Sequence, residues 1–350
     1  MSRFSNKKLR IIVLMHEDLI PPDTIKGVSD EEMQPWKTEY DVMVTLRDMG
    51  HEVTPIGVYN DLGVIYKAIG DYKPHLAFNL VEEFHGFAVY DQHVASFLEL
   101  MEQPYSGCNP RGLTLAHDKA LSKSILTYHR VAVPRFAVFP MNRKIRRPKR
   151  LGFPLLVKSV SEEGSVGISQ ASIVNDDKKL QERVEFVHRW VETDAIAEQY
   201  IVGRELYVSV VGNQRLQVFP PWELIIKNLP AGAPHIATGK VKWNLKYQKT
   251  AGVDTRAARG LPEEIQKNIA RISKRVYRIL SLSGYTRLDF RFTEDGQLFL
   301  MEANPNPNLS YGDDFSESAA FAGVDYEQLL GRILRLGLTY QPLGVRPAEG

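Results

Sequence analysis

Cysteine is nearly absent from this sequence: Cys108 is the only one among 350 residues. An internal disulfide is therefore excluded, and a reducing compartment suits the chain, so we expect a cytoplasmic protein. A single cysteine can act as a nucleophile, but it is more often a small buried hydrophobe. No pattern of cysteine and histidine surrounds Cys108, which favours the buried role.

Long apolar runs and an excess of one charge are absent as well. No stretch approaches the roughly 18 apolar residues that a membrane-crossing helix needs, and Leu9–Met15 is too short for the apolar core of a signal peptide with its cleavage site. Lys and Arg number 44 against 42 Asp and Glu, for a net charge of +2. We therefore expect neither a membrane nor a nucleic acid as partner. The basic stretch Met141–Arg150 is either a binding site for a polyanion or, the favoured reading, a solvated connecting loop.

What the sequence does contain is a pattern of alternating strands and helices. Its length and its hydrophobic content of 43% suit two or three globular units. Alternation in the first hundred residues predicts a parallel, doubly wound sheet. The expected strands are Leu9–Met15, His51–Ile56 and Pro74–Leu80, and the expected helices are one from Trp36 that stops at Gly50, then Leu62–Ile69 and Gln92–Met101.

Further elements follow, and the clearest is a helix over Pro262–Leu280 with an apolar stripe that includes Ile269 and Val276. Its basic opposite face is either a binding surface or, the favoured reading, a solvated face. The proline- and glycine-containing residues after Tyr340 are expected to form a loosely ordered tail. The other expected elements are helices near Ala116–His129 and Asp177–Val191, and strands at Pro134–Phe139, Pro154–Ser159, Ala195–Gln199, Glu205–Val211 and Leu216–Phe219.

The most informative segment is an expected β-hairpin in the last third of the chain. Asp295-Gly296 separates two alternating runs and indicates a two-residue turn. That turn would place Asp289 opposite Glu302 and Arg287 opposite Asn304, all on one face of the hairpin. The other face would carry the apolar side chains Leu288, Phe290, Phe292, Phe299, Met301 and Ala303.

Two carboxylates that face each other on a sheet repel unless a cation lies between them. Oxygen ligands from Asp289, Glu302 and Asn304 suit Mg²⁺, with substrate phosphates completing its octahedron. Arg287 would then stabilise negative charge that develops in the reaction. The alternative is an ordinary polar face on which Arg287 or Arg291 neutralises the acids. The hairpin alone leaves the two readings nearly even.

Three further segments carry groups that suit a nucleotide. Lys119 opens a helix and Lys158 ends a strand, where a compact charge can reach phosphates. The loop Gly164–Gly167 can turn backbone N–H groups toward phosphate oxygens, or can be a simple surface turn. Glu198 and Glu205 flank a strand break, where they can accept hydrogen bonds from adenosine or form a charged hairpin edge.

Taken in order, these motifs resemble the ATP-grasp enzymes and, among them, the D-alanine–D-alanine ligases. Singly the motifs are modest, but in this order and spacing they are specific. The resemblance covers about residues 75–335 and rests on Asp118-Lys119, Phe153-Pro154 with Lys158, Glu163–Gly167, Glu198 with Gly203-Arg204-Glu205, Arg287-Leu288-Asp289 and Glu302-Ala303-Asn304.

The resemblance implies an α/β protein with the ATP-grasp fold in three parts. These are an N-terminal doubly wound domain over 1–112, a central lobe over 113–197 and a C-terminal lobe with the metal site over 198–340, followed by the tail 341–350. The family is often dimeric, so a homodimer is implied. The implied ATP-binding residues are Lys119, Lys158, Gly164, Ser165, Val166, Gly167, Glu198, Ile201 and Glu205.

The implied reaction is phosphoryl transfer from ATP to a substrate carboxylate, followed by attack of an amine on the acyl phosphate and release of phosphate. Lys242 would reach the transferred phosphate, and Arg287 would steady the tetrahedral intermediate. Closure of the glycine loop would exclude water. The implied magnesium ligands are Asp289, Glu302 and Asn304, for two ions, with Mn²⁺ as the alternative metal.

The substrate residues depart from the D-alanine–D-alanine ligase pattern. Gly164 stands where those enzymes carry a serine, Trp243 where they carry a tyrosine, and Pro305–Tyr311 replaces their Thr-Ser-Pro-Gly-Met stretch. Glu17 and Glu82 can each bind an ammonium group or be solvated carboxylates, and His85 is a candidate base or an uninvolved loop residue. The candidate substrate-binding residues are Glu17, Glu82, Asn308 and Ser310.

We therefore expect a carboxylate–amine ligase for an amino acid or small peptide other than D-alanine. The first alternative is a D-alanine–D-alanine ligase proper. The second is a regulatory protein that binds ATP without turning it over. Retention of Lys242, Arg287 and the three metal ligands argues against the regulator, because simple binding has less need of Arg287.

Overall fold

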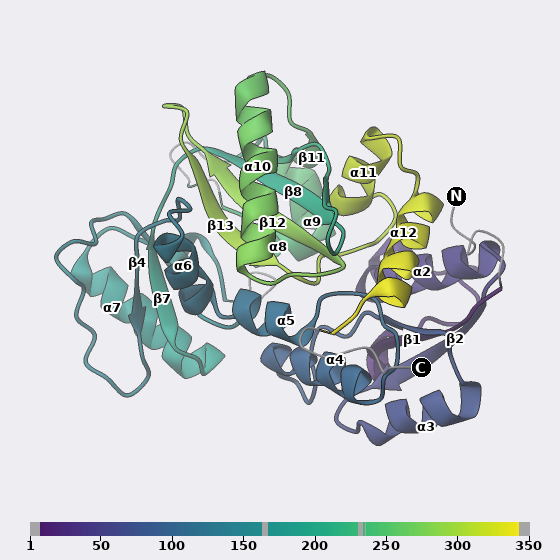
Figure 1. Ribbon diagram of the computed structural model, residues 1–350. Coiled ribbons are helices and arrows are strands. Elements are labelled where there is room, and N and C mark those ends of the chain that lie inside the picture. Colours follow the sequence, from purple (N-terminus) through teal and green to yellow (C-terminus); the bar gives the residue numbers. More distant parts are fainter. Residues whose placement is uncertain (1–7, 163–166, 230–233, 235, 343–350) are drawn as a thin grey trace.

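The computed structural model describes residues 8–162, 167–229, 234 and 236–342, which form three successive sheets with helices packed against them (Figure 1). The loop residues Gly164, Ser165 and Val166 and the end of the tail lie outside the described residues. Within the described ranges no helix has both the length and the apolarity needed to cross a bilayer.

The first sheet is parallel and has helices on both faces, as predicted. Its strands follow the order β2-β1-β3. Because alternate side chains of a strand point to opposite faces, Ile11 and Val13 pack with α2 and α12, whereas Ile12 and Leu14 pack with α3 and α4. Both faces are covered, which explains the uninterrupted apolar run of β1. The bounds are β1 Arg10–His16, β2 Glu52–Val58, β3 Leu76–Asn79, α2 Lys37–Asp48, α3 Gly63–Tyr72, α4 Asp91–Leu100 and α12 Tyr326–Thr339.

The second sheet is antiparallel, with the strand order β4-β7-β5-β6. Helix α7 covers it with Leu180 and Val184, and the π-helical turn that continues α7 adds Val187. The expected helix over Asp177–Val191 is therefore confirmed. Strand β7 ends two residues beyond the expected boundary at 197/198, and the domain boundaries stay predictions. The bounds are β4 Phe136–Phe139, β5 Leu155–Ser159, β6 Ile173–Val174, β7 Ala195–Gln199 and α7 Asp177–Phe186, which continues as a π-helical turn over Val187–Val191.

The third sheet is also antiparallel and carries most of the candidate site. Its order is β11-β10-β8-β12-β13, with β9 paired to β8. The long predicted helix is α10, and Ile269 and Val276 pack it against one face of the sheet. Pro262 is its N-cap residue rather than part of its first turn. The bounds are β8 Arg204–Val211, β9 Gln217–Val218, β10 Trp222–Ile226, β11 Val253–Ala257, β12 Tyr285–Phe292, β13 Leu298–Asn304 and α10 Glu263–Ile279.

The expected helix over Ala116–His129 is wrong in extent, because two helices occupy this region. Asp118 has an extended backbone and separates them, and its Oδ1 accepts hydrogen bonds from the N–H groups of Ala120 and Leu121 at 2.9 and 2.8 Å. The two helices are α5 Pro110–His117 and α6 Lys119–Tyr128. The other elements that the sequence patterns did not indicate are α1 Asp30–Met33, α8 Gly239–Trp243, α9 Leu245–Ala251, α11 Asp314–Phe321, α12, β6, β10, β11 and the short 3₁₀ turns at Glu17–Leu19, Gln34–Trp36, Ala88–Tyr90 and Gln170–Ser172.

Candidate active site

The β12–β13 hairpin has the predicted pairs but not the predicted turn. Asp289 lies opposite Glu302 and Arg287 opposite Asn304. The N–H of Thr293 bonds to the carbonyl of Gln297 at 3.0 Å, so the loop has three residues and ends at Gly296, whose φ is 82°. A longer loop alone would shift the register by one residue. A bulge in β13 cancels that shift: Met301 is the extra residue, opposite the step from Asp289 to Phe290.

The bulge also changes which side chains of β13 enter the core. Leu298 and Leu300 are buried together with Leu288 and Phe290, whereas Phe299 and Met301 are not part of this core. The expectation that Phe299 and Met301 face the core is therefore wrong. An extra residue in one strand reverses the alternation on one side of the bulge, and sequence periodicity gives no sign of it.

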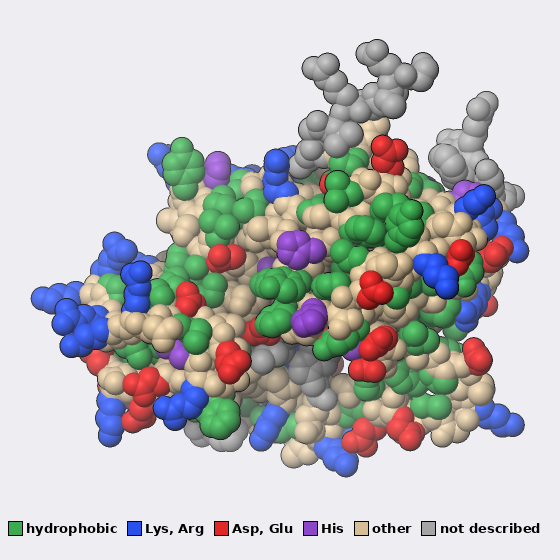
Figure 2. Space-filling model, turned by 90° about the horizontal axis from the view of Figure 1, so that it is seen from below, with side chains coloured by type: hydrophobic (Ala, Val, Ile, Leu, Met, Phe, Trp, Pro, Cys, Tyr) green, Lys and Arg blue, Asp and Glu red, His purple; other side chains and the backbone are tan. Residues whose placement is uncertain are grey.

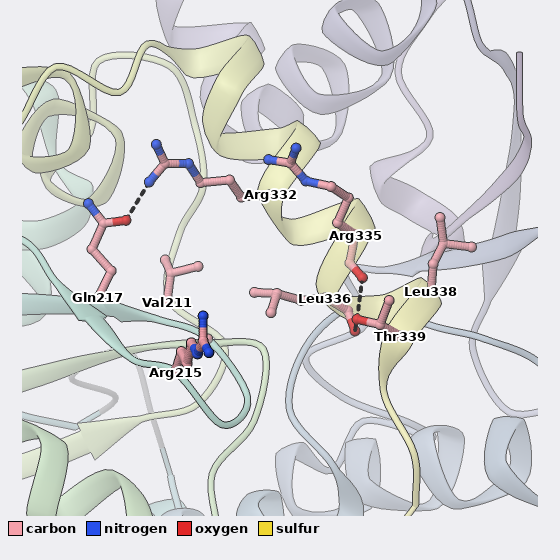
Figure 3. A pocket seen from close by; sticks show the side chains of 9 residues that line it. Val211, Arg215, Gln217, Arg332, Arg335, Leu336, Leu338 and Thr339 are labelled. Carbon is pink, nitrogen blue, oxygen red and sulfur yellow. Dashed lines mark hydrogen bonds between the residues drawn. The ribbon is translucent and has the colours of Figure 1, made fainter. Parts of the chain in front are cut away.

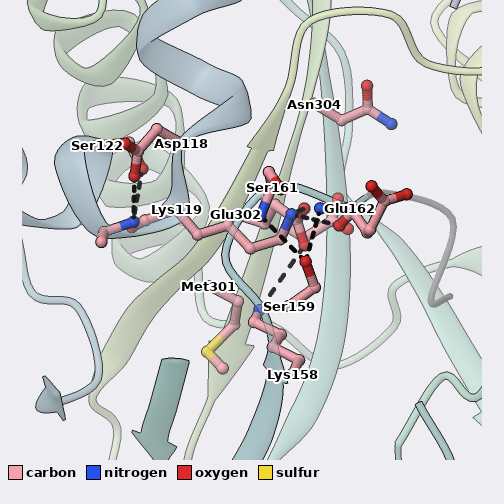
Figure 4. Close-up of polar contacts among 12 residues, drawn as sticks. Asp118, Lys119, Ser122, Lys158, Ser159, Ser161, Glu162, Met301, Glu302 and Asn304 are labelled. Carbon is pink, nitrogen blue, oxygen red and sulfur yellow. Dashed lines mark hydrogen bonds and ion pairs between the residues drawn. The ribbon is translucent and has the colours of Figure 1, made fainter. Parts of the chain in front are cut away.

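Glu302 is the centre of a group of lysines (Figure 4). Its Oε1 lies 3.2 Å from Lys119 Nζ, and its Oε2 lies 4.0 Å from Lys158 Nζ. Lys119 Nζ also donates a hydrogen bond of 2.7 Å to the carbonyl of Glu162. Burial alone would raise the pKa of Glu302, but the ammonium groups of Lys119, Lys158 and Lys242 hold it well below its usual range. Glu302 is therefore ionised, as a metal or phosphate site requires.

Asp289 is held by Arg287 on the same strand. Arg287 Nε and Nη2 donate to the two carboxylate oxygens of Asp289 at 2.8 and 3.1 Å. Arg287 Nη1 donates to Oδ2 of Asp314 at 3.2 Å, and the guanidinium lies 4.5 Å from the ring centre of Tyr207. Burial raises the pKa of Asp314 to about 7 in spite of Arg287. Asp314, at the start of α11, was not among the predicted site residues.

A second carboxylate, that of Glu198, shares Lys158 with Glu302. Glu198 is fully buried, and its two oxygens lie 3.5 Å from Lys123 Nζ and 3.4 Å from Lys158 Nζ. Lys123 also donates to the carbonyl of Met301. Burial lowers the pKa of Lys123, and the charge of Glu198 opposes that effect. Lys123 was missed, although its position four residues after Lys119 on α6 places both on one helix face.

The remaining ATP-binding candidates have varied surroundings. Glu205 accepts hydrogen bonds from Arg291 Nη2 at 2.6 Å and from the Tyr207 hydroxyl at 3.0 Å, so part of its capacity is already used. Ile201 is buried. Gly167 has a φ of 68°. Lys242 lies on α8, close enough to lower the pKa of Glu302.

The candidate substrate residues divide into two groups. Glu17 and Glu82 are exposed and follow β1 and β3, which are adjacent parallel strands. Asn308 and Ser310 instead bind α2: Asn308 Oδ1 accepts from Thr38 Oγ1 at 2.7 Å, and the hydroxyls of Thr38 and Ser310 lie 2.8 Å apart. The structure thus shows that Asn308 and Ser310 attach the loop after β13 to α2. Their contact with substrate stays a prediction.

A polar chain links Asn304 to the N-terminal sheet region, and its other members were not predicted. Asn304 Oδ1 accepts from the N–H of Asn306 at 2.9 Å, and Asn306 Nδ2 donates to Asp91 Oδ2 at 2.8 Å. His117 Nε2 lies 2.8 Å from the same oxygen. These contacts orient the loop after β13, and with it the amide proposed as a metal ligand.

His85 lies at the tip of a short turn, within a row of aromatic rings. Its ring stacks between those of Tyr59 and Phe87, with centroids 6.0 and 6.4 Å apart. Phe87 and Tyr90 continue the row at 5.1 Å. Hydrophobic and histidine side chains gather near the middle of the lower face of the molecule (Figure 2). Within the described part of the chain, no hydrogen bond or ion pair joins the His85 ring to the lysine and carboxylate groups, so its role as a base stays a prediction.

Glu39 on α2 is expected to make stability depend on pH. It is buried beside Asn79 and Asn306, and burial raises the pKa of its carboxyl from 4.5 to about 7. Between these values the folded state binds more protons than the unfolded state, so the free energy of unfolding should fall as pH rises through this range. Glu39→Gln should remove this slope and be more stable by about 3 kcal/mol at about pH 8.

Urea unfolding at a series of pH values measures this effect. Glu31→Gln, at an exposed side chain of α1, is the matched control and should keep the slope. An unchanged slope in Glu39→Gln would show that another group titrates in this range.

Comparison with known proteins decides the family. A family model described as the D-Ala D-Ala ligase C-terminus matches residues 126–335. The chain belongs to the D-alanine–D-alanine ligase family. The D-alanine–D-alanine ligase of Nitratidesulfovibrio vulgaris (strain DP4) is 30% identical over 313 residues, which cover 87% of this chain and 96% of that protein. That of Desulfotalea psychrophila (strain LSv54 / DSM 12343) is 31% identical over 273 residues, covering 75% and 78%.

Solved structures of the D-alanine–D-alanine ligase family have the same fold. The crystal structure of the Bacillus anthracis enzyme complexed with ATP has a TM-score of 0.72 at 26% identity and covers 94% of this chain and 97% of that chain. The expected ATP-grasp fold and the expected enzyme class are thereby confirmed. This member of the D-alanine–D-alanine ligase family is an ATP-dependent, ADP-forming ligase that makes a C–N bond.

Proposed function

We propose that this protein activates the carboxylate of an amino acid or small peptide as an acyl phosphate, with Mg-ATP, and joins it to an amine. The observation that carries the proposal is the pairing of Asp289 and Glu302 across one hairpin, with Lys119, Lys158 and Lys242 acting on Glu302. Two acids surrounded by cations suit a site that binds a metal nucleotide and must balance its charge.

The donors present fit a magnesium site. Asp289, Glu302 and Asn304 offer oxygen atoms from neighbouring positions on paired strands, and a hard cation prefers oxygen. The described residues contain no cluster of three or more His, Cys, Asp and Glu suited to a metal, so the remaining ligands would be phosphate oxygens and water. We assign these three residues to two Mg²⁺ ions, with Mn²⁺ as the alternative. When bound, the ions would neutralise charge on the phosphates.

The basic residues would then change partners when the nucleotide binds. Lys119 and Lys158, now paired with Glu302, would turn to the phosphates, and Lys242 would meet the phosphoryl group in transfer. Arg287 is held between Asp289 and Asp314. Once a cation engages Asp289, two donors of Arg287 would be free to stabilise the negative oxygen that forms when the amine attacks.

The proposed reaction needs no reactant beyond ATP, the carboxylate and the amine. The substrate carboxylate bonds to the terminal phosphorus of ATP as ADP leaves. The amine nitrogen then bonds to the acyl carbon, loses a proton to water or a nearby base, and inorganic phosphate departs. We assign Glu198, Ile201 and Glu205, with the loop Gly164–Gly167, to ATP binding.

The substrate is proposed to be an amino acid or peptide other than D-alanine. Pro305–Tyr311 differs from the family pattern, and two of its side chains, Asn308 and Ser310, are bound to Thr38. Glu17 and Glu82 remain the proposed amine-binding groups. The second candidate is D-alanine–D-alanine ligase activity itself, which the names of the relatives favour. The single cysteine supports a reducing, cytoplasmic setting, and a homodimer is proposed from the family resemblance alone.

Phosphate release from Mg-ATP, screened against D- and L-amino acids singly and in pairs, tests the proposal. We expect release only when both a carboxylate and an amine substrate are present, and with a pair other than D-alanine alone. Release with D-alanine alone would identify a D-alanine–D-alanine ligase. Saturable ATP binding without release on any mixture, dipeptides included, would favour the regulatory alternative. Chelation of divalent ions should stop the reaction, and Mn²⁺ should restore it.

A further inference from the structure

A hollow separate from the candidate active site lies beside the third sheet, between the β8–β9 connection and helix α12 (Figure 3). Its volume is about 280 Å³. Small-molecule sites have volumes from roughly 300 Å³ upward, so this hollow is near the lower end of that range. We call it the arginine pocket, and its lining residues are Val211, Gly212, Arg215, Gln217, Arg332, Arg335, Leu336, Leu338 and Thr339.

Three arginines and no acidic residue line the arginine pocket. Arg332 and Arg335 are one turn apart on α12, and Arg215 reaches the same hollow from the β8–β9 connection. Arg332 donates to the side-chain oxygen of Gln217. Among the described residues, none of the three forms an ion pair with a carboxylate. Elsewhere Arg204 and Arg291 have carboxylate partners at 2.7 and 2.6 Å.

This charge arrangement favours the binding of an anion. Three like charges around one hollow repel one another, and a concave site concentrates their field more than a flat surface does. Guanidinium groups match phosphate oxygens with paired hydrogen bonds. Three cations without a carboxylate favour a dianion, so a phosphate monoester fits better than a carboxylate.

The same hollow has an apolar side. Val211 is buried, and Leu336 and Leu338 are partly buried along the last turn of α12. An inorganic anion would leave these apolar side chains in contact with water, whereas an organic anion with an apolar body would cover them. The lining therefore combines the two components of a small-molecule site, a few polar groups and an apolar wall.

The arginine pocket is distinct from the candidate active site. Val211 ends β8, six residues beyond Glu205, which corresponds to about 20 Å along a strand. In the register with β12, Val211 pairs with Tyr285, whereas Asp289 pairs with Tyr207. Helix α12 also packs on the N-terminal sheet through Leu330 and Ile333. A ligand in the pocket would thus connect the third sheet to α12, which also packs on the first sheet.

We propose that the arginine pocket binds a small organic phosphate, with the phosphate at Arg332, Arg335 and Arg215 and the apolar body against Leu336 and Leu338. This site is additional to the ATP site, and its existence does not depend on the proposed ligase reaction. The expected consequence is that such an anion stabilises the contact between the β8–β9 connection and α12.

Calorimetric titration with phenyl phosphate tests the proposal, in protein saturated with Mg-ADP so that the nucleotide site is occupied. We expect saturable binding by the wild type and a loss of affinity of about tenfold or more in the Arg332→Gln/Arg335→Gln double variant. Arg271→Gln, which removes the same charge from the exposed face of α10, should bind as the wild type does. Benzoate and inorganic phosphate should each bind more weakly than phenyl phosphate.

Binding that fails to saturate at millimolar concentrations would overturn the proposal, as would equal affinity in the wild type and the double variant. Thermal melting of each variant shows whether a loss of binding reflects a loss of fold. If the double variant melts early, Arg215→Gln at the exposed connection provides the test, because no described residue forms a hydrogen bond or ion pair with the Arg215 side chain. Equal binding of phenol and phenyl phosphate would reduce the site to an apolar hollow and would also contradict the proposal.

Discussion

Replacing Glu302 by Gln is expected to lower phosphate release from Mg-ATP by about a thousandfold while the protein stays folded. The carboxylate lies opposite Asp289 and within 3.2 Å of Lys119. Glutamine has the same shape but cannot offset the lysines or bind a cation with full charge. The measurement is steady-state phosphate release with the substrate pair found by screening, together with a thermal melt.

The control and a second measurement separate metal binding from a general loss of charge. Glu294→Gln removes the same charge at the exposed tip of the hairpin and should leave the rate unchanged. In Glu302→Gln, the Mg²⁺ concentration for half-maximal rate should rise, because the substitution weakens a proposed metal ligand. A variant with the wild-type rate and the wild-type Mg²⁺ requirement would remove Glu302 from the metal and phosphate site.

The substitution Lys123→Met is expected to lower the free energy of unfolding by about 3–5 kcal/mol. Lys123 and Lys158 are the two cations beside the fully buried carboxylate of Glu198, at 3.5 and 3.4 Å. Methionine fills a similar volume but leaves Glu198 with one cationic partner, and a buried charge without enough compensation is costly. Urea unfolding at neutral pH measures the change.

Two further variants make this test specific. Lys267→Met removes an exposed lysine of α10, whose side chain is 75% exposed, and should change stability by well under 1 kcal/mol. The double variant Lys123→Met/Glu198→Gln should recover part of the lost stability, because it removes both charges. Equal losses in Lys123→Met and Lys267→Met would show that the buried pair contributes nothing. A loss in the double variant at least as large as in Lys123→Met would assign the effect to packing.

These two predictions concern successive layers of one charge network. Lys158 is shared, since its ammonium lies 3.4 Å from Glu198 and 4.0 Å from Glu302. Positive and negative side chains therefore alternate in the order Lys119, Glu302, Lys158, Glu198 and Lys123. Such an arrangement would hold the lysines that we propose to bind phosphate in place before ATP arrives, which would reduce the reorganisation needed for catalysis.

Much of the fold could be predicted from the sequence because its signals are local. The apolar stripe of α10 and the alternation that produced the first parallel sheet depend on residues close together in the chain. Lys119 at a helix start and Lys158 at a strand end could be selected as candidates for the same reason. The short elements β10, β11, α8 and α9 have weak periodicity, so tertiary contacts determine them.

The hairpin shows how a correct pairing can arise for a different reason than the one expected. Asp289 does face Glu302, but only because the bulge at Met301 compensates a loop one residue longer than predicted. A turn dipeptide specifies loop length imperfectly, and a bulge has no signature in the alternation of side chains. The wrong assignment of Phe299 and Met301 to the core follows directly from this.

By itself, the sequence determined the chemical inventory of this protein: the acids and amide of one hairpin, the lysines that suit phosphate, and the order of motifs shared with the ligase family. Only the tertiary structure decided which charges meet. Lys123 with Glu198, Asp314 with Arg287, and the three arginines of the pocket come from segments far apart in the chain. Long-range contacts of this kind depend on packing between elements, and no local pattern of residues specifies them.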